Sequence, residues 1–179
     1  MTNYVRNAVL HFKTITRHRH LVMLHCFKAG IPLQGLKHDL SKYSPTEFLV
    51  GVKYFNGSKS PNVADRQENG YSSAWLHHKG RNKHHFEYWF DNDVATQSIV
   101  PVEMPINYVI EMVCDRMAAC KVYKGDAYTN ASALEYFNKH NYATMMVPQT
   151  EALLRKLLTM LAEEGEDALF RYMRHLKSY

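Results

Sequence analysis

The chain has 179 residues, of which 46% are apolar and 22% charged, and its formal net charge is +5. This composition is typical of a folded globular protein and excludes a disordered or fibrous chain. The positive charge is mild and forms no basic block, so neither nucleic acid nor a membrane surface is an expected partner.

Apolar periodicity and helix-ending residues predict a mainly helical chain. The first helix ends at Ala29-Gly30, and Ser44-Pro45 starts another, because Gly is favoured just after a helix and Pro in its first turn. The predicted helices cover 2–27, a short segment from Pro32 that carries His38 and Asp39, 45–55, 73–80, 82–90, 106–124, 132–139, 149–163 and 166–177. Residues 58–70 are rich in turn residues and are predicted to be a loop, which is a candidate lid over a site.

These elements predict one all-α domain over residues 1–179, with no sheet of more than two short strands. The functional core is expected within about residues 18–124, with the C-terminal helices of 130–177 packed on it. The three cysteines have no C-x-x-C spacing, which argues against a disulfide framework. No apolar run approaches the ~18 residues of a membrane-spanning helix. A cytoplasmic protein is therefore expected.

The segment 36–42, with the sequence Leu-Lys-His-Asp-Leu-Ser-Lys, contains an adjacent pair of metal-binding residue types. On a helix, His38 and Asp39 leave the axis about 100° apart, so they can bind one metal, or Asp39 can bridge two. Lys42 lies three residues after Asp39 and projects from the same side of a helix. A cation at that position suits an anionic ligand, phosphate above all.

The segment 77–85 has four histidines within nine residues, which a solvated surface does not require. Neutral imidazole binds Zn, Fe, Mn or Ni, so the segment predicts metal ligation without naming the metal. His78 and His85 share helix sides with tryptophans and are expected to point inward. His77 and His84 are expected to bind a second metal or to contact the substrate. Arg81 and Asn82, between the two histidine pairs, are placed to orient an anion.

Asp115 lies on a strongly apolar helix, where an unpaired carboxylate is costly to bury. We expect it to be the last metal ligand, with Glu111 as its support or as a general base. The first ligand is one of three histidines on the first helix, His18, His20 and His25. Of these, His20 is preferred because it starts the apolar turn of residues 21–24.

The ordered set of His20, His38-Asp39 and Asp115 resembles the HD-domain superfamily of metal-dependent phosphohydrolases, whose pattern is an early His, a His-Asp pair and a late Asp on helices. The strings H-D-L-S-K, H-H-K-G-R-N-K-H-H and E-M-V-C-D-R also resemble a family of small, uncharacterised bacterial proteins. The spacing from His20 to His38 is shorter than in the simple HD pattern. The extra histidines are similar to those of HD proteins with two or three metals, which include cyclic-dinucleotide phosphodiesterases and di-iron oxygenases. The Gly-Tyr-Pro signature of those phosphodiesterases is absent, so their substrate is not implied.

This resemblance implies an HD-like helical bundle that hydrolyses a phosphate ester or a nucleotide with one or two divalent ions, chosen among Fe, Mn, Zn, Ni and Mg. The implied metal ligands are His20, His38, Asp39, His77, His78, His84, His85 and Asp115. Asp39, Lys42, Arg81 and Asn82 are the expected catalytic group. The expected partner is a small phosphorylated or anionic substrate, and a homodimer is left open. Two alternatives also stay open: a di-iron oxygenase with the same ligands, and a non-catalytic protein that binds metal or nucleotide.

Overall fold

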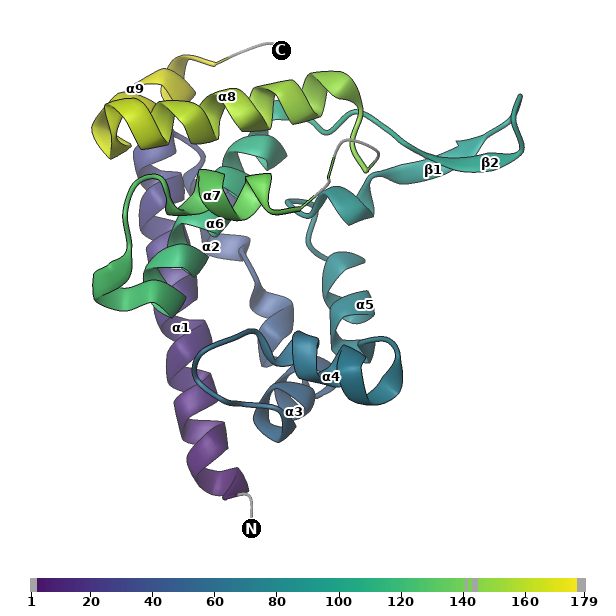
Figure 1. The fold of residues 1–179 in the computed structure, drawn as a ribbon, viewed down its shortest axis with the longest axis vertical. Coiled ribbons are helices and arrows are strands. Elements are labelled where there is room, and N and C mark those ends of the chain that lie inside the picture. Colours follow the sequence, from purple (N-terminus) through teal and green to yellow (C-terminus); the bar gives the residue numbers. More distant parts are fainter. Residues whose placement is uncertain (1–2, 141, 143–144, 177–179) are drawn as a thin grey trace.

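The computed structural model describes residues 3–140, 142 and 145–176. Within these residues the chain forms nine α-helices, three short 3-10 helices and one two-stranded antiparallel sheet (Figure 1). The α-helices are α1 (Tyr4–Ala29), α2 (Pro32–Lys37), α3 (Pro45–Lys53), α4 (Pro61–Asn69), α5 (Ser73–Lys79), α6 (Ile106–Lys124), α7 (Ser132–Asn138), α8 (Pro148–Glu164) and α9 (Glu166–His175). The 3-10 helices are η1 (Leu40–Tyr43), η2 (Phe86–Tyr88) and η3 (Gly125–Ala127), and the strands are β1 (Phe90–Asp93) and β2 (Ser98–Pro101). The all-α expectation is therefore confirmed.

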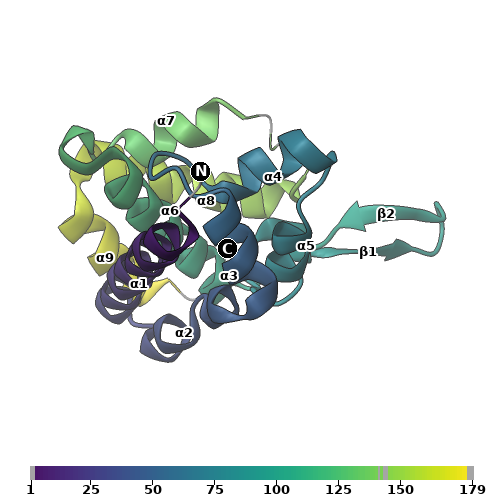
Figure 2. The same ribbon diagram turned by 90° about the horizontal axis from the view of Figure 1, so that it is seen from below.

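The two longest helices, α1 and α6, pack against each other and form the centre of the fold (Figures 1 and 2). The helix α1 begins where the Asn3 side chain accepts a hydrogen bond from the Arg6 amide, and it ends at Gly30 in the left-handed region, as predicted. The α8–α9 pair covers one end of α1 and α6, and α3, α4 and α5 lie along the other end. Residue 177, which the sequence prediction includes in the last helix, lies outside the described residues.

The apolar core lies at the α8–α9 end. Its fully buried members include Val22 and Cys26 of α1 and Met117 of α6, packed against four leucines of α8. Complete burial of a leucine side chain contributes about 1.5–3 kcal/mol. The core therefore fixes α1 and α6 relative to each other, while polar side chains occupy the space beside them. No helix of the described chain is long and apolar enough to cross a membrane.

Two sequence predictions about local structure are wrong. The predicted lid loop contains α4, which Pro61 begins and Gly70, in the left-handed region, ends. The residues between Pro61 and Gly70 are mostly polar and form no apolar stripe, so the sequence predicts a loop there. The predicted helix over 82–90 is instead a turn, η2 and the first residue of a hairpin. Asp93 accepts hydrogen bonds from the amides of Ala95 and Thr96, which closes that hairpin.

The β1–β2 hairpin projects away from the helices (Figures 1 and 2). Its register pairs Phe90 with Pro101 and Asp93 with Ser98. It joins the histidine-rich segment to α6 and contributes no residue to the polar cluster described below. The hairpin is the one sheet of the described residues, which confirms the prediction of no sheet with more than two short strands.

Candidate metal centre

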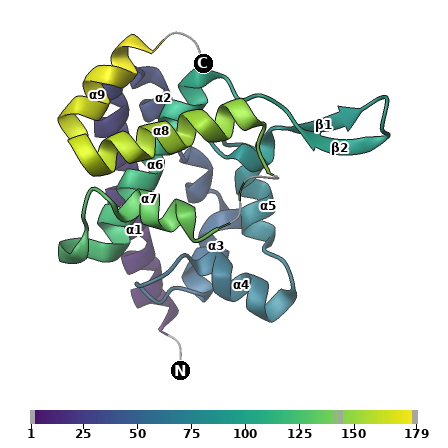
Figure 3. The same ribbon diagram turned by 45° about the horizontal axis from the view of Figure 1, so that its top comes forward.

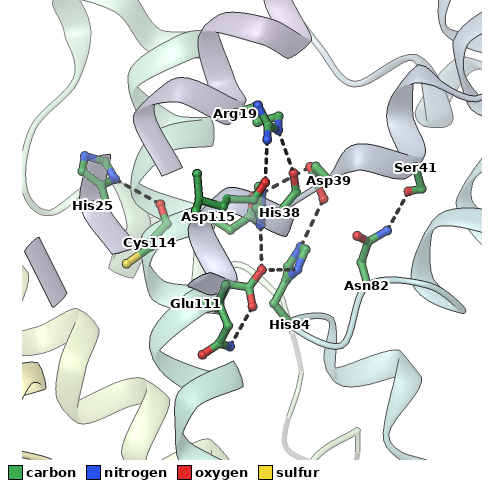
Figure 4. A network of polar contacts seen from close by, with 12 residues as sticks. Arg19, His25, His38, Asp39, Ser41, Asn82, His84, Glu111, Cys114 and Asp115 are labelled. Atoms are coloured by element: carbon green, nitrogen blue, oxygen red, sulfur yellow. Dashed lines mark hydrogen bonds and ion pairs between the residues drawn. The ribbon is translucent and has the colours of Figure 1, made fainter. Parts of the chain in front are cut away.

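His38 and Asp39 form a corner between α2 and η1 rather than part of a helix. The helix α2 ends at Lys37, His38 is extended, and Asp39 has a φ of 54°. Left-handed backbone is disfavoured for most residues but is tolerated by Asp. Arg19 of α1 fixes the corner, because its guanidinium donates to the carbonyls of His38 (3.2 Å) and Leu36 (2.5 Å) (Figure 4). The prediction that a helix carries this pair is therefore wrong, although both side chains point inward.

Asp39 is shared by two groups of potential metal ligands. The first, here called the aspartate tetrad, consists of His18, His38, Asp39 and Asp115. The second, here called the histidine tetrad, consists of Asp39, His78, His84 and His85. In each tetrad the ligand atoms lie within 4.8 Å of one another.

The two carboxylate oxygens of Asp39 face different tetrads. Oδ2 lies 3.3 Å from Nε2 of His38 and 3.6 Å from Nε2 of His18. Oδ1 lies 3.3 Å from Nε2 of His78 and 3.5 Å from Nε2 of His84. This is the arrangement by which one carboxylate bridges two metal ions.

The inward atoms of the cluster are buried and lack hydrogen-bond partners. They are Asp39 Oδ1 and the Nε2 atoms of His38, His78, His84 and His85. A buried polar atom without a partner is costly, so five of them in one cluster require an explanation. Cations bound by imidazole nitrogen and carboxylate oxygen would satisfy all five, and such a donor set suits first-row transition metals. The residues present therefore fit a metal centre.

The opposite nitrogens of three histidines are held by carboxylates. Glu111 Oε1 accepts from Nδ1 of His38 (2.9 Å) and of His84 (3.1 Å), as Figure 4 shows. Glu47 Oε2 accepts from Nδ1 of His78 (2.8 Å). With Nδ1 donating, each Nε2 lone pair faces the cluster, which is the usual way in which proteins orient metal-binding histidines.

Glu111 belongs to this outer layer rather than to the ligands. Its carboxylate also forms a compact group with His38 and His84 that has the spacing of a metal site. A metal there would use the Nδ1 atoms and leave the buried Nε2 atoms unpaired, so we assign Glu111 to positioning. Gln34 of α2 donates to its second oxygen (3.0 Å). The sequence analysis offered two roles for Glu111, support of a ligand and general base. The contacts with His38 and His84 favour support.

The carboxylates of the centre carry negative charge. Burial alone would raise the pKa of Glu111, but hydrogen bonds from His38 and His84 lower it to about 2. Burial would likewise raise the pKa of Asp115, which its contacts with His18 and His38 hold well below the usual value. For His38, burial lowers the pKa, and the surrounding carboxylates outweigh it and raise the pKa well above the usual value. Glu111 and Asp115 are therefore anionic, and they lie beside the space that a cation would fill.

The structure brings together most of the residues that the sequence singles out, and it places four of them, His20, His77, Arg81 and Asn82, outside the ligand groups. His38, Asp39, His78, His84, His85 and Asp115 lie in the two tetrads. His20 is exposed, and His18 takes its place because it shares the buried face of α1 with Ile15 and Val22. That three- and four-residue spacing was the signal that could have identified His18.

One other candidate ligand, His77, and both candidate anion-binding residues, Arg81 and Asn82, also lie outside the tetrads. His77 donates to Glu47 (2.7 Å) and so steadies the carboxylate that orients His78. Arg81 is exposed, and its guanidinium donates to the His77 carbonyl. Asn82 is buried, but its amide donates to Ser41 and to the His78 carbonyl (both 2.8 Å), so it joins η1 to α5 instead of orienting an anion. No local sequence pattern indicates Glu47, because its role depends on packing between α3 and α5.

Lys42 lies beside the centre, with its ammonium 3.4 Å from Asp39 Oδ2. A cavity of about 790 Å³ opens at this point, and Lys42, His18, His78, His85 and Asp115 are among the residues that line it. Residues of α4, α5, α6 and α7 are among those that line the cavity. Figure 3 shows where these helices lie in the fold. Its volume is in the range of small-molecule sites.

Comparison with known families places the chain in one of them. Residues 7–160 match the model of a family described as a family of unknown function (DUF5662), and the chain belongs to this family. The matched range includes every member of the two tetrads. No curated protein and no solved structure matches the chain significantly.

Proposed function

We propose that this member of the family is a metal-dependent phosphohydrolase with a dinuclear centre of the HD type. The observation that carries the proposal is the pair of tetrads that share Asp39, with one carboxylate oxygen directed at each. The order of the ligands also supports it: an early His18, the pair His38-Asp39 and a late Asp115 follow the HD pattern, with His18 in place of His20.

The donor set favours transition metals over magnesium, because imidazole is a poor ligand for Mg²⁺. His18, His38 and Asp115 would hold one ion, and His78, His84 and His85 the other, with Asp39 between them. When bound, the ions would polarise a phosphoryl oxygen and activate water as the nucleophile.

Lys42 would hold the phosphate of the substrate. Its ammonium lies at the cavity side of Asp39, so it can meet an anion that reaches the centre. Asp39 already pairs with this ammonium, and a phosphate at the metals would give it a second anionic partner. Ser41 and Asn82 would keep His78 and η1 in place, and they are not required to touch the substrate.

The test begins with protein purified without chelators or a nickel column. We expect up to two transition-metal ions per chain by elemental analysis, and metal-dependent hydrolysis of p-nitrophenyl phosphate or of its diester. Lys42→Ala should keep its metal content and lose turnover by on the order of a hundredfold, which is typical for loss of a contact with transition-state charge. Arg81→Ala is the matched control, because this cation is exposed and outside the cavity. Metal-loaded protein that hydrolyses neither ester would contradict the proposal.

The histidine-rich ligand set favours one second candidate, a di-iron oxygenase. Five imidazoles around a shared carboxylate can hold iron in both redox states. Loading with Fe²⁺ without oxygen, followed by measurement of oxygen consumption with anionic substrates, separates the two candidates. Oxygen uptake that depends on substrate, without phosphate release, would favour the oxygenase. Metal binding with neither reaction would favour a non-catalytic role.

A further inference from the structure

The cavity over the metal centre contains a second group of polar side chains, away from the ligands. Arg116 of α6, Glu87 of η2 and Arg66 of α4 all line it. Two atoms of this group, Arg116 Nε and Glu87 Oε2, are buried and have no hydrogen-bond partner. The proposed metal centre accounts for neither atom, so the group needs its own explanation.

The Arg116 guanidinium stacks on two aromatic rings. Its central carbon lies 5.7 Å from the centroid of the Phe137 ring and 5.3 Å from that of Tyr142. The guanidinium donates a long hydrogen bond from Nη2 to the Met112 sulfur (3.9 Å) and another to the Tyr142 hydroxyl. No carboxylate of the described residues lies within ion-pair distance of it. Stacking fixes the plane of a guanidinium and leaves its N–H edge available to an oxyanion.

Arg66 repeats this arrangement at the mouth of the cavity. Its guanidinium lies 5.4 Å from the Trp75 ring, and within the described chain it also forms no ion pair. Both arginines lie near Glu87. Burial raises the pKa of Glu87, and the charges of Arg116, Lys79 and Arg66 oppose that rise. Two arginines and one carboxyl group thus line this end of the cavity, which leaves an excess of positive charge.

We propose that Arg116 and Arg66, with Glu87 beside them, form a second oxyanion subsite, and that the substrate therefore carries two anionic groups. One group would lie at the metals and Lys42, and the other, a carboxylate or a second phosphate, between the arginines. The placement of the first group rests on the proposed function, while the second subsite rests on the arginines alone. A rival explanation is that the arginines only balance Glu87. It accounts for one of the two positive charges and leaves the buried Nε of Arg116 without a partner.

The experiment measures binding rather than turnover, with phosphonates that are not hydrolysed. Calorimetry compares a simple alkylphosphonate with ω-phosphonocarboxylates and alkylene bisphosphonates whose linkers have one to six carbons. At the linker length that spans the cavity, we expect the second anionic group to tighten binding about tenfold or more, as one charge-assisted hydrogen bond typically does. The better of the two series identifies the second group as a carboxylate or a phosphate.

Variants assign this gain to the arginines. Arg116→Met and Arg66→Met, alone and together, should remove the advantage of the two-headed probes and leave the affinity for the simple alkylphosphonate unchanged. Arg155→Met is the matched control, because Arg155 also stacks on Phe137 (4.8 Å) but is paired with Glu151 and does not line the cavity. Arg66 is exposed, so its variant should fold even if Arg116→Met does not, as circular dichroism would show.

Two results would overturn the inference: no advantage of a second anionic group at any linker length, or an advantage that survives in the double variant. Failure of the proposed function is seen separately. If the protein binds the probes with two anionic groups through its arginines but hydrolyses no phosphoester, the second subsite stands and the proposed phosphohydrolase activity does not.

Discussion

Asp39 combines three properties that a metal-bridging residue needs. It is buried, its two oxygens face different sets of histidines, and Lys42 balances part of its charge. Its left-handed backbone turns the chain so that His38 and Asp39 both face the cluster. An Asn at this position would tolerate the same backbone but would lose the charge that attracts the metals.

His18 and His20 provide a direct test of the assignment of the first ligand. His18→Ala should reduce bound metal, because its Nε2 lies 2.9 Å from Asp115 in the aspartate tetrad. His20→Ala should bind metal like wild type, since His20 is exposed and belongs to neither tetrad. Elemental analysis of the two purified variants is the measurement. Equal metal loss in both, or a loss in His20→Ala alone, would contradict the placement of the centre.

Glu111 tests whether orientation of the histidines matters. Glu111→Gln should weaken metal binding by about 10–100-fold, the usual cost of removing a group that orients ligands. The reason is that one amide oxygen is a weaker acceptor than the carboxylate that now serves both His38 and His84. Competition with a chelator of known affinity measures the loss. Glu135→Gln, at an exposed carboxylate outside the centre, is the control.

At this scale the sequence predicts the types and order of the ligands but not the atoms that orient them. The His-Asp pair, the histidine-rich segment and Asp115 are visible because such residues are rare in apolar surroundings. The choice between His18 and His20 depends on which face of α1 is buried, and the apolar turn that follows His20 does not mark that face. Glu47 and His77 meet only because α3 packs on α5, a contact that no local pattern reveals.

Among the elements, α2 controls the centre through its close approach to α1. A Cβ atom on Gly35 would lie 2.7 Å from Cys26 Cβ and 3.1 Å from Met23 Cα. Only glycine therefore allows α2 to approach α1 this closely. The helix is six residues long and leads directly into His38. Its position therefore sets that of the His-Asp corner.

Gly35→Ala should push α2 away from α1 and impair both stability and metal binding. Overpacking of this kind typically costs about 1–3 kcal/mol in the free energy of unfolding. Chemical denaturation of the metal-free protein and metal titration of the same variant measure the two effects. A variant with normal stability and weakened metal binding would still support the role of α2, whereas normal metal binding would contradict it.

Helix ends were predicted well where the chain carries capping residues, as at Gly30, Pro45 and Ser72. The limits of α6 match the prediction at both ends, since prolines precede it and Gly125 follows it. The predictions failed at α4 and at the hairpin. There, helix and strand are set by caps and turn hydrogen bonds rather than by apolar periodicity.

For the whole molecule, buried neutral histidines link stability to pH. Burial, with the nearby charge of Lys121, lowers the pKa of His25 to about 4. The unfolded chain, in which this pKa is about 6.5, therefore binds a proton that the folded chain refuses as the pH falls from 6.5 toward 4. The stability contributed by neutral His25 is full above pH 6.5 and is lost through that window.

Between pH 6.5 and pH 5, wild type should lose about 2 kcal/mol of unfolding free energy through this residue, at 1.36 kcal/mol per pH unit. His25→Gln should lack that part of the loss, whatever its stability at neutral pH. Denaturation of both metal-free proteins at the two pH values gives the difference, in which titrations at the metal centre cancel. Equal losses in both proteins would show that His25 is not held neutral.

The helix α6 has one further consequence, which concerns the order of synthesis. It carries Asp115, which completes the aspartate tetrad, and Glu111, which orients one histidine of each tetrad. All other ligands precede it in the chain, from His18 to His85. A nascent chain that has emerged from the ribosome only as far as the hairpin thus has its histidines, Asp39 and Glu47 but lacks Glu111 and Asp115. If the proposed dinuclear centre forms, tight binding of both metals would arise in a single stage, when residues 106–124 emerge and fold against α1.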